Sequence, residues 1–167
     1  MIKLHEHAFS SAIGTITLLS SPAGICYVHF GGEPGKVYRA FIHRHFPGAS
    51  VERGGESNDE AARQILAYLD GKLTEFTVPL DLKTTPFYAK VLAEVKRIPY
   101  GKTKTYGEIA VALGKPGASR AVGGANASNP IPLFIPCHRV IASDGLCGYA
   151  FGLPTKIKLL RLEGVAV

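Results

Sequence analysis

The sequence predicts a mixed α/β fold of the α+β type, in which a small N-terminal β-sheet carries helices and the C-terminal part is mainly helical. Strand patterns lie within residues 2–30, whereas helical periodicity dominates after residue 85. The charge changes between the same two parts. Residues 1–80 hold 7 Lys+Arg and 8 Asp+Glu, net −1, and residues 81–167 hold 12 and 5, net +7. We therefore predict two domains, 1–80 and 81–167.

The composition indicates a chain that folds without membrane segments, and its cysteine content fits a reducing compartment. Of the 167 residues, 46% are hydrophobic, and no apolar run approaches the roughly 20 residues that a membrane-spanning helix needs. The first residues show no basic region followed by an apolar stretch, so we expect a cytoplasmic protein with no membrane partner. Three cysteines cannot all pair within the chain. No CxxC or zinc-finger spacing occurs, and His5/His7 and His43/His45 fit solvated positions, so we expect no metal and no cofactor.

Turn residues divide the N-terminal apolar residues into strands. The runs Thr15–Leu19 and Ile25–Phe30 are separated by Ser21-Ser-Pro-Ala-Gly, which predicts a small antiparallel sheet over residues 2–30. Two helices should pack on this sheet. They are predicted from apolar residues at helical spacing: Val37, Ala40, Phe41 and Phe46 within 36–46, and Ala62, Ile65, Leu66 and Leu69 within 58–69. Residues 73–85 contain Pro79 and lack a helical period, which places the domain boundary there.

The first helix of the second domain has a clear start. Thr85 is a suitable N-cap, and Pro86 fits the first helical position because its missing N–H is not needed there. The helix should end before Pro99, where Pro-Tyr-Gly predicts a turn. Its buried stripe is predicted to be Phe87, Val91, Leu92 and Val95.

Two short helices follow in the order of a helix-turn-helix. Thr105 and Glu108 have the spacing of a capping box, and they open a helix with Ile109, Ala112 and Leu113 inside before Gly114 ends it. A tight connection over 115–119 leads to a second helix over 120–127. Two short helices on a basic domain are typical of a DNA-reading unit, although such pairs also occur in ordinary helical packing. The positive charge favours nucleic acid over an anionic membrane as a partner, but many basic proteins bind neither.

The second of these helices contains Gly123 and Gly124, each of which costs about 1 kcal/mol relative to alanine. Close approach to another surface is the usual reason for such glycines. That surface is either DNA, where small residues suit the narrow minor groove, or a tightly packed neighbouring helix.

Cys137 lies in a segment with three prolines in seven residues, which predicts a rigid extended backbone. His138, Arg139 and the basic surroundings favour a thiolate at this position, and the thiolate is the nucleophilic form of cysteine. The alternatives are an inert buried cysteine and a cysteine hydrolase, for which His138 is poorly placed because neighbouring side chains in extended chain point to opposite sides. Cys26 and Cys147 lack this setting and are predicted to be structural.

Five motifs closely resemble those of the O6-alkylguanine-DNA alkyltransferases, the methylated-DNA–protein-cysteine methyltransferases. They are Ile135-Pro-Cys-His-Arg-Val140, Arg120-Ala-Val-Gly, Thr105-Tyr-Gly, Asn129-Pro and Leu162-Glu-Gly. The resemblance covers residues 81–164, and the first motif is highly specific. It implies a DNA-repair protein that binds duplex DNA, flips out an O6-alkylguanine and moves the alkyl group irreversibly to its own cysteine. It also implies that residues 1–80 form the family's ribonuclease-H-like domain, and we expect a monomer with O4-alkylthymine as a lesser substrate.

The resemblance also implies roles for single residues. Cys137 would be the acceptor, and His138, held by Glu163, would remove its proton through a water. Tyr106 would rotate the target phosphate and protonate the leaving guanine, Arg120 would fill the gap in the base stack, and Asn129 would orient the turn that holds the cysteine. The backbone oxygens of Cys137 and Val140 would accept hydrogen bonds from the guanine amine. Further DNA-facing residues are predicted to be Ala121, Gly123, Gly124 and Ala127, and the substrate pocket Pro132, Val140, Tyr149, Ala150 and Phe151.

The chain departs from the family pattern after the acceptor motif. Three residues lie between Gly145 and Tyr149 where many members have four, and Phe151 stands where glycine is common. We therefore predict that Phe151 narrows the pocket and disfavours bulky adducts. The zinc ligands of some members have no counterparts. Two rival functions are a non-catalytic lesion sensor, whose known relatives lack the cysteine at position 137, and a helix-turn-helix regulator.

Overall fold

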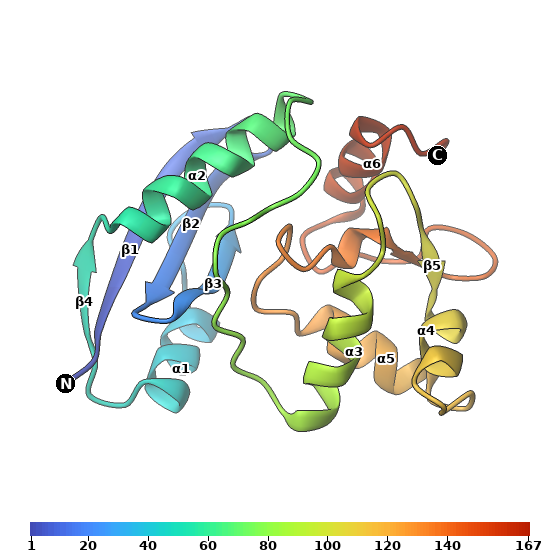
Figure 1. Ribbon diagram of the computed structural model, residues 1–167, viewed down its shortest axis with the longest axis horizontal. Helices are drawn as coiled ribbons and strands as arrows, with labels where there is room; N and C mark the ends of the chain where they lie inside the picture. Colours follow the sequence, from blue (N-terminus) through green and yellow to red (C-terminus); the bar gives the residue numbers. More distant parts are fainter. The chain divides into compact units, whose positions relative to one another are not determined.

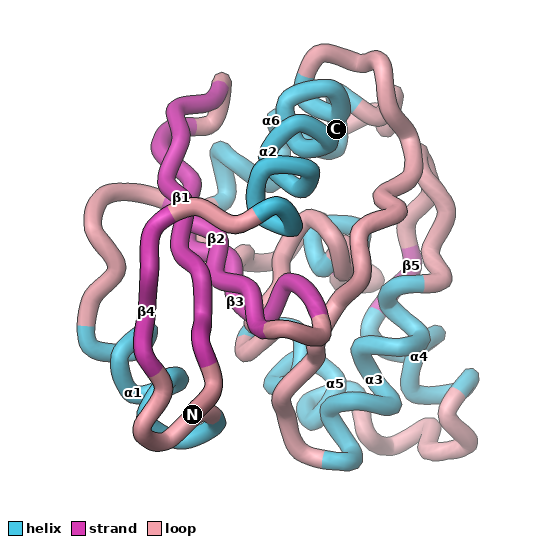
Figure 2. The backbone as a smooth tube through the Cα atoms, turned by 60° about the vertical axis from the view of Figure 1, so that its left-hand side comes forward, coloured by secondary structure: helices cyan, strands magenta, loops and turns pink.

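The alternating apolar residues at the start of the chain form three antiparallel strands, as predicted. They are β1 (Lys3–Ser11), β2 (Gly14–Ser21) and β3 (Gly24–Phe30). The computed structural model describes residues 1–167 as two units, Met1–Lys83 and Thr84–Val167. A fourth strand, β4 (Ser50–Arg53), runs parallel to β1 and gives the order β3-β2-β1-β4 (Figure 2). The strand β4 was not predicted, because its four residues lie at a sheet edge and three of them are exposed.

Helices cover the sheet in the first unit. Leu18 and Leu19 are both fully buried, and because neighbouring strand residues point to opposite faces, both faces of β2 are covered. The helix α1 (Lys36–His45) packs through Tyr38 against Leu4 and Leu19, and α2 (Glu56–Leu69) runs along the strands (Figure 1).

The predicted buried faces of these helices were partly wrong. Val37 is 75% exposed, Ala40 is exposed, and Leu66 is 45% exposed. Tyr38 takes the core position in α1 because its ring is apolar while its hydroxyl donates a hydrogen bond to Glu6. In α2 the buried residues are Asn58, Ala61, Ala62, Ile65 and Tyr68.

Residues 70–85 contain no helix, and part of this segment lies along β3. Ile25 N–H donates to the Pro79 carbonyl at 2.9 Å, and Asp81 N–H donates to the Ile25 carbonyl at 2.8 Å. Gly24 permits this contact, because a Cβ there would lie 2.4 Å from the Pro79 oxygen.

The second unit is mainly helical, as predicted. Its elements are α3 (Pro86–Lys96), β5 (Lys104–Thr105), α4 (Tyr106–Ala112), α5 (Ser119–Ala127), the short 3₁₀ helix η1 (Cys137–Arg139), β6 (Val140–Ile141) and α6 (Leu153–Leu162). Both predicted N-caps are present: Thr85 Oγ1 accepts from Tyr88 N–H at 3.4 Å, and Thr105 Oγ1 accepts from Glu108 N–H at 3.1 Å. In α4 the buried residues are Ile109 and Ala110, whereas the predicted Ala112 is exposed.

The close approach at Gly124 is made by a neighbouring helix. A Cβ on Gly124 would lie 2.9 Å from the hydroxyl of Tyr88 on α3, so the packing alternative is correct for this residue. Gly123 faces the Tyr106 ring, where a Cβ would make an ordinary contact at 3.9 Å.

The segment before Cys137 is not extended, contrary to the prediction. Leu133 has a left-handed backbone with φ of 73°, and Ile135 N–H donates to the Ile131 carbonyl at 3.0 Å, so the chain turns back. Prolines fix their own φ but also favour turns, and this second property determines the conformation here. None of the helices combines the length and the hydrophobicity that a membrane-spanning helix needs.

Candidate functional site

Cys137 begins the 3₁₀ helix η1 and is 1% exposed. Its N–H donates to the Ile135 carbonyl at 2.8 Å, and its own carbonyl accepts from Asn126 Nδ2 of α5 at 3.2 Å. The backbone on both sides of the sulfur is therefore fixed by hydrogen bonds to the preceding turn and to a neighbouring helix.

Asn129 holds the turn that precedes the cysteine. Its Nδ2 donates to the Ile135 carbonyl at 2.9 Å, and its Oδ1 accepts from Ile131 N–H at 3.0 Å. One amide thus closes the turn from both ends, because it offers a donor and an acceptor in a fixed relation. The position agrees with the orienting role that the resemblance implies.

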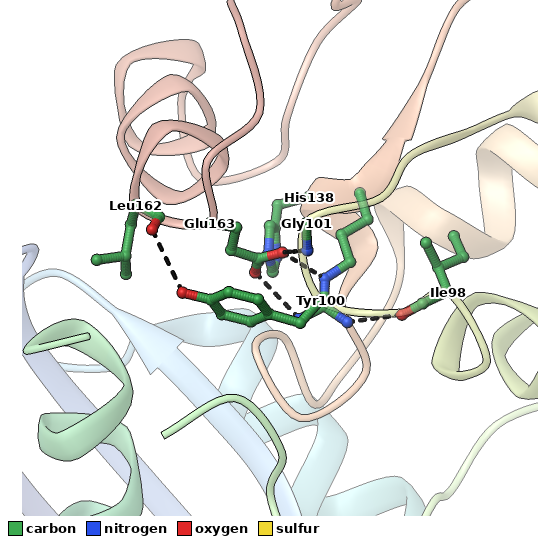
Figure 3. A network of polar contacts seen from close by, with 7 residues as sticks. Ile98, Tyr100, Gly101, His138, Leu162 and Glu163 are labelled. Carbon is green, nitrogen blue, oxygen red and sulfur yellow. Dashed lines mark hydrogen bonds and ion pairs between the residues drawn. The ribbon is translucent and has the colours of Figure 1, made fainter. Parts of the chain in front are cut away.

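A buried ionic network surrounds His138, the residue that follows Cys137, and Figure 3 shows its polar contacts. Glu163, at the end of α6, has Oε2 at 2.7 Å from His138 Nε2 and receives two hydrogen bonds from Arg139, at 2.8 and 3.0 Å. Its Oε1 also accepts from Gly101 N–H at 3.0 Å. Arg139 donates further to the Ile98 carbonyl at 2.7 Å. The carboxylate is therefore held by two basic side chains and a backbone donor.

Burial alone would raise the pKa of Glu163, but hydrogen bonds from His138 and Arg139 outweigh it and lower the pKa to about 2. Burial, together with the charges of Arg139 and Lys156, lowers the pKa of His138 against the raising effect of Glu163, so the imidazole is neutral. We assign the charge pair to Glu163 and Arg139, because arginine remains charged in proteins. His138 Nε2 then carries the proton that faces Glu163, which leaves Nδ1 as the ring atom able to accept one.

Burial raises the pKa of the Cys137 thiol, which is opposite to the thiolate that the sequence analysis favoured. Three neighbours act in the other direction: hydrogen bonding to Asn129, hydrogen bonding to Tyr149, and the charge of Lys156. The resting sulfur is therefore a thiol whose ionisation depends on these groups and on a base.

A pocket of about 500 Å³ lies beside this centre in the second unit. Six predicted residues line it, namely Tyr106, Arg120, Gly123, Ala127, Tyr149 and Ala150. The pocket is also lined by Ser119, Asn126, Cys147 and Gly148, which the sequence analysis did not assign to it. Burial is the main cause that raises the pKa of Tyr106, so its hydroxyl keeps its proton at neutral pH.

Other predicted residues lie outside the pocket wall. Pro132 and Val140 are buried, Ala121 is exposed on α5, and Gly124 faces Tyr88. Phe151 does not line the pocket, but its ring meets the Tyr149 ring edge-on, with centroids 5.3 Å apart.

The two remaining cysteines differ from each other. Cys26 is buried and donates to the Leu19 carbonyl at 3.4 Å, which fits a structural residue. Cys147 is exposed, with φ of 57°, and lines the pocket, so the structural interpretation of Cys147 was wrong. No disulfide forms, and no group of three or more His, Cys, Asp or Glu side chains is placed to hold a metal ion.

Three residues of this centre were not predicted, and the reason differs for each. Arg139 was only noted as a source of charge, although its place in the acceptor motif was a signal. Asn126 contacts the Cys137 carbonyl across eleven positions, and only the fold brings them together. Lys156 has no sequence signal, because a lysine in a helix is ordinarily exposed, yet this one is fully buried.

Two family models match consecutive parts of the chain. The model described as 6-O-methylguanine DNA methyltransferase, ribonuclease-like domain, matches residues 4–82. The model described as 6-O-methylguanine DNA methyltransferase, DNA binding domain, matches residues 86–165.

The alignments with similar proteins cover nearly the whole chain. The methylated-DNA–protein-cysteine methyltransferase of Methanosarcina acetivorans is 46% identical over 157 residues, which are 93% of this chain and 96% of that protein. The crystal structure of the Mycobacterium tuberculosis O6-methylguanine methyltransferase superposes with a TM-score of 0.83 at 38% identity, covering 98% of this chain and 95% of that one. A crystal structure of the M. tuberculosis protein in complex with DNA gives 0.82 at 38% identity, covering 95% and 92%.

Proposed function

This chain belongs to the 6-O-methylguanine DNA methyltransferase family, and we propose that it repairs duplex DNA by moving an alkyl group from guanine O6 to Cys137. The arrangement of Cys137, His138 and Glu163 carries this proposal. The sulfur forms a bond to the alkyl carbon as the carbon–oxygen bond breaks, and the bonding electrons leave with the guanine. The product is a thioether, so each molecule acts once.

The proton of the thiol leaves toward His138. Since Glu163 is ionised and faces Nε2, the neutral imidazole presents Nδ1 as its acceptor, and a water between Nδ1 and the sulfur completes the path. The ion pair of Glu163 with Arg139 keeps the carboxylate charged throughout, so the imidazolium that forms is stabilised.

The leaving guanine needs a proton as its oxygen takes up electrons. Tyr106 lines the pocket and remains protonated at neutral pH, so its hydroxyl is a suitable donor. The backbone oxygens of Cys137 and Val140 are the acceptors that we assign to the guanine amine. The Val140 oxygen accepts from Lys156 Nζ, which leaves it a second lone pair, whereas the Cys137 oxygen accepts from both Asn126 Nδ2 and the Val140 N–H, so the amine must share or replace one of these two bonds.

DNA binds to the helix-turn-helix formed by α4 and α5. Arg120 is exposed near the start of α5 and lines the pocket, which supports its insertion into the stack after the base swings out. The small residues Ala121, Gly123 and Ala127 suit a minor groove, and the net charge of +7 in residues 81–167 attracts the phosphates. Gly124 is committed to packing against Tyr88 and has no DNA contact in this proposal.

We further propose that the protein acts as a monomer in the cytoplasm, where a reducing environment keeps its three cysteines as the free thiols seen in the structure. O4-alkylthymine is a lesser substrate because thymine lacks the amine that the two carbonyls recognise.

The test is incubation with duplex DNA that carries a radiolabelled O6-methylguanine. We expect one label per chain in the parent and none in Cys137→Ala. A parent protein that binds the lesion but takes up no label would favour the lesion sensor instead. Sequence-selective binding without label would favour the regulator.

A further inference from the structure

Lys156 is a fully buried lysine in the second unit, and the mechanism above does not use it. It lies in the first half of α6. Its Nζ donates to the Val140 carbonyl at 2.6 Å and to the Gly148 carbonyl at 3.2 Å. No carboxylate forms an ion pair with it, and Glu163, the C-cap of the same helix, is engaged by His138 and Arg139. A buried ammonium with only carbonyl partners is costly, so its charge needs an explanation.

The two carbonyls belong to two different segments of the candidate site. Val140 directly follows η1, which begins with the acceptor Cys137, and the Val140 oxygen is a proposed contact of the guanine amine. Gly148 lines the pocket and precedes Tyr149, whose hydroxyl lowers the pKa of the Cys137 thiol. Lys156 therefore ties the pocket wall to the acceptor segment.

The charge of Lys156 also acts on the sulfur. It lowers the pKa of Cys137, and Cys137 and Cys147 in turn raise the pKa of Lys156 against the effect of its burial. Arg120 also lines the pocket, but it is exposed, so solvent screens its charge. The remaining groups around this centre add little net charge. His138 is neutral, Tyr106 keeps its proton, and Arg139 is balanced by Glu163. Cys147 and Cys137 are thus the groups that can supply a counter-charge to Lys156, and of these two only Cys137 is buried.

We propose that Lys156 is a positioning residue for alkyl transfer, which holds Val140 and Gly148 together around the acceptor and supplies the positive charge that favours the Cys137 thiolate. This inference depends on the proposed function only in the experiment that measures alkyl transfer. The ionisation of the thiol can be tested without any alkylated substrate.

The first test compares Lys156→Met with the parent by thiolate ultraviolet absorbance against pH. In each case the signal of the corresponding Cys137→Ser protein is subtracted, which removes the tyrosines and the other cysteines. We expect the midpoint of Cys137 to rise by about one pH unit or more, the usual effect of losing a nearby opposite charge. Lys158→Met, an exposed lysine on the same helix, should leave the midpoint unchanged. An unchanged midpoint in Lys156→Met would overturn the proposal.

A second test holds even if Lys156→Met does not fold. Coupling between two charges is reciprocal, so removing the thiolate must also affect the ammonium. The NMR titration of the Lys156 ε-carbon should have a lower midpoint in Cys137→Ser than in the parent. Equal midpoints in the two proteins would contradict the coupling.

The pH dependence of the alkyl-transfer rate distinguishes an electrostatic role of Lys156 from a purely structural one. If Lys156 acts through the thiolate, Lys156→Met should lose about tenfold in transfer rate at neutral pH and recover as the pH rises above the new midpoint. An equal loss at every pH would refute the charge part. If the parent transfers nothing while the two titrations shift as expected, the proposed function fails and the pairing of Lys156 with Cys137 stands.

Discussion

Glu163→Gln changes one oxygen of the buried carboxylate to an amide with almost no change in size. The variant keeps an acceptor for His138 but leaves the Arg139 guanidinium buried without its counter-charge. Glu163 is 5% exposed, so water cannot replace the lost charge. The substitution therefore isolates the ionic part of the network in Figure 3.

The size of the effect follows from the pKa of Glu163. Its lowering from 4.5 to about 2 corresponds to about 3 kcal/mol of folding free energy. Because the folded pKa lies below the unfolded one, this contribution is complete above pH 4.5 and is lost as the pH falls through about 2. By linkage about 2 kcal/mol should remain near pH 3.5. The variant lacks this contribution at every pH.

The assay is urea unfolding of the parent and the variant between neutral pH and about pH 3.5, analysed as a two-state transition. We expect the variant to be about 3 kcal/mol less stable at neutral pH, with the gap narrowing in acid. Glu94→Gln is the matched control, because its partner Arg97 is 77% exposed and such surface pairs contribute at most about 1 kcal/mol. A gap that is constant with pH, or no larger than that of the control, would show that the Glu163 carboxylate does not stabilise the fold through its charge.

Three further substitutions test other parts of the molecule. Arg120→Ala should slow repair of duplex DNA about tenfold and leave the reaction with free O6-benzylguanine nearly unchanged, because only duplex has a gap to fill; equal losses in the two rate assays would exclude the stacking role. Phe151→Gly frees the Tyr149 ring from its edge-on contact, so inactivation by O6-benzylguanine should quicken by up to about tenfold, and equal rates for variant and parent would exclude this effect. Gly124→Ala should lower the free energy of unfolding in urea by about 1 kcal/mol, because the new Cβ would lie 2.9 Å from the Tyr88 hydroxyl. In a Tyr88→Phe background the same substitution should be neutral or stabilising, and an equal loss in both backgrounds would contradict this packing.

Local signals in the sequence predicted local structure well. Thr85 and Thr105 were recognised as N-caps from their own neighbours, because capping involves residues only three positions apart. The strand β4 was missed, since a short edge strand gains its stability from pairing with β1 across more than forty residues. Proline-rich chain before Cys137 was predicted to be extended, and the turn at Leu133 became evident only in the fold.

The chemistry of the site was predictable in type but not in its electrostatics. The acceptor motif pointed to Cys137 and His138 and the Leu162-Glu-Gly motif to Glu163, and the structure brings His138 and Glu163 within 2.7 Å. The motif favoured a Cys137 thiolate, but burial raises the pKa of the thiol. This difference could not be predicted, because a sequence motif does not show how deeply a side chain is buried. The place of Lys156 in the site could not be predicted for the same reason, since its burial follows from the fold.

The most direct test of the account is peptide mapping by mass spectrometry after exposure to duplex DNA that contains O6-methylguanine. We predict that the peptide with Cys137 gains the mass of one methylene and that the peptides with Cys26 and Cys147 gain none. A protein that remains unmodified at Cys137, or that carries the methyl group on another residue, would contradict the central claim.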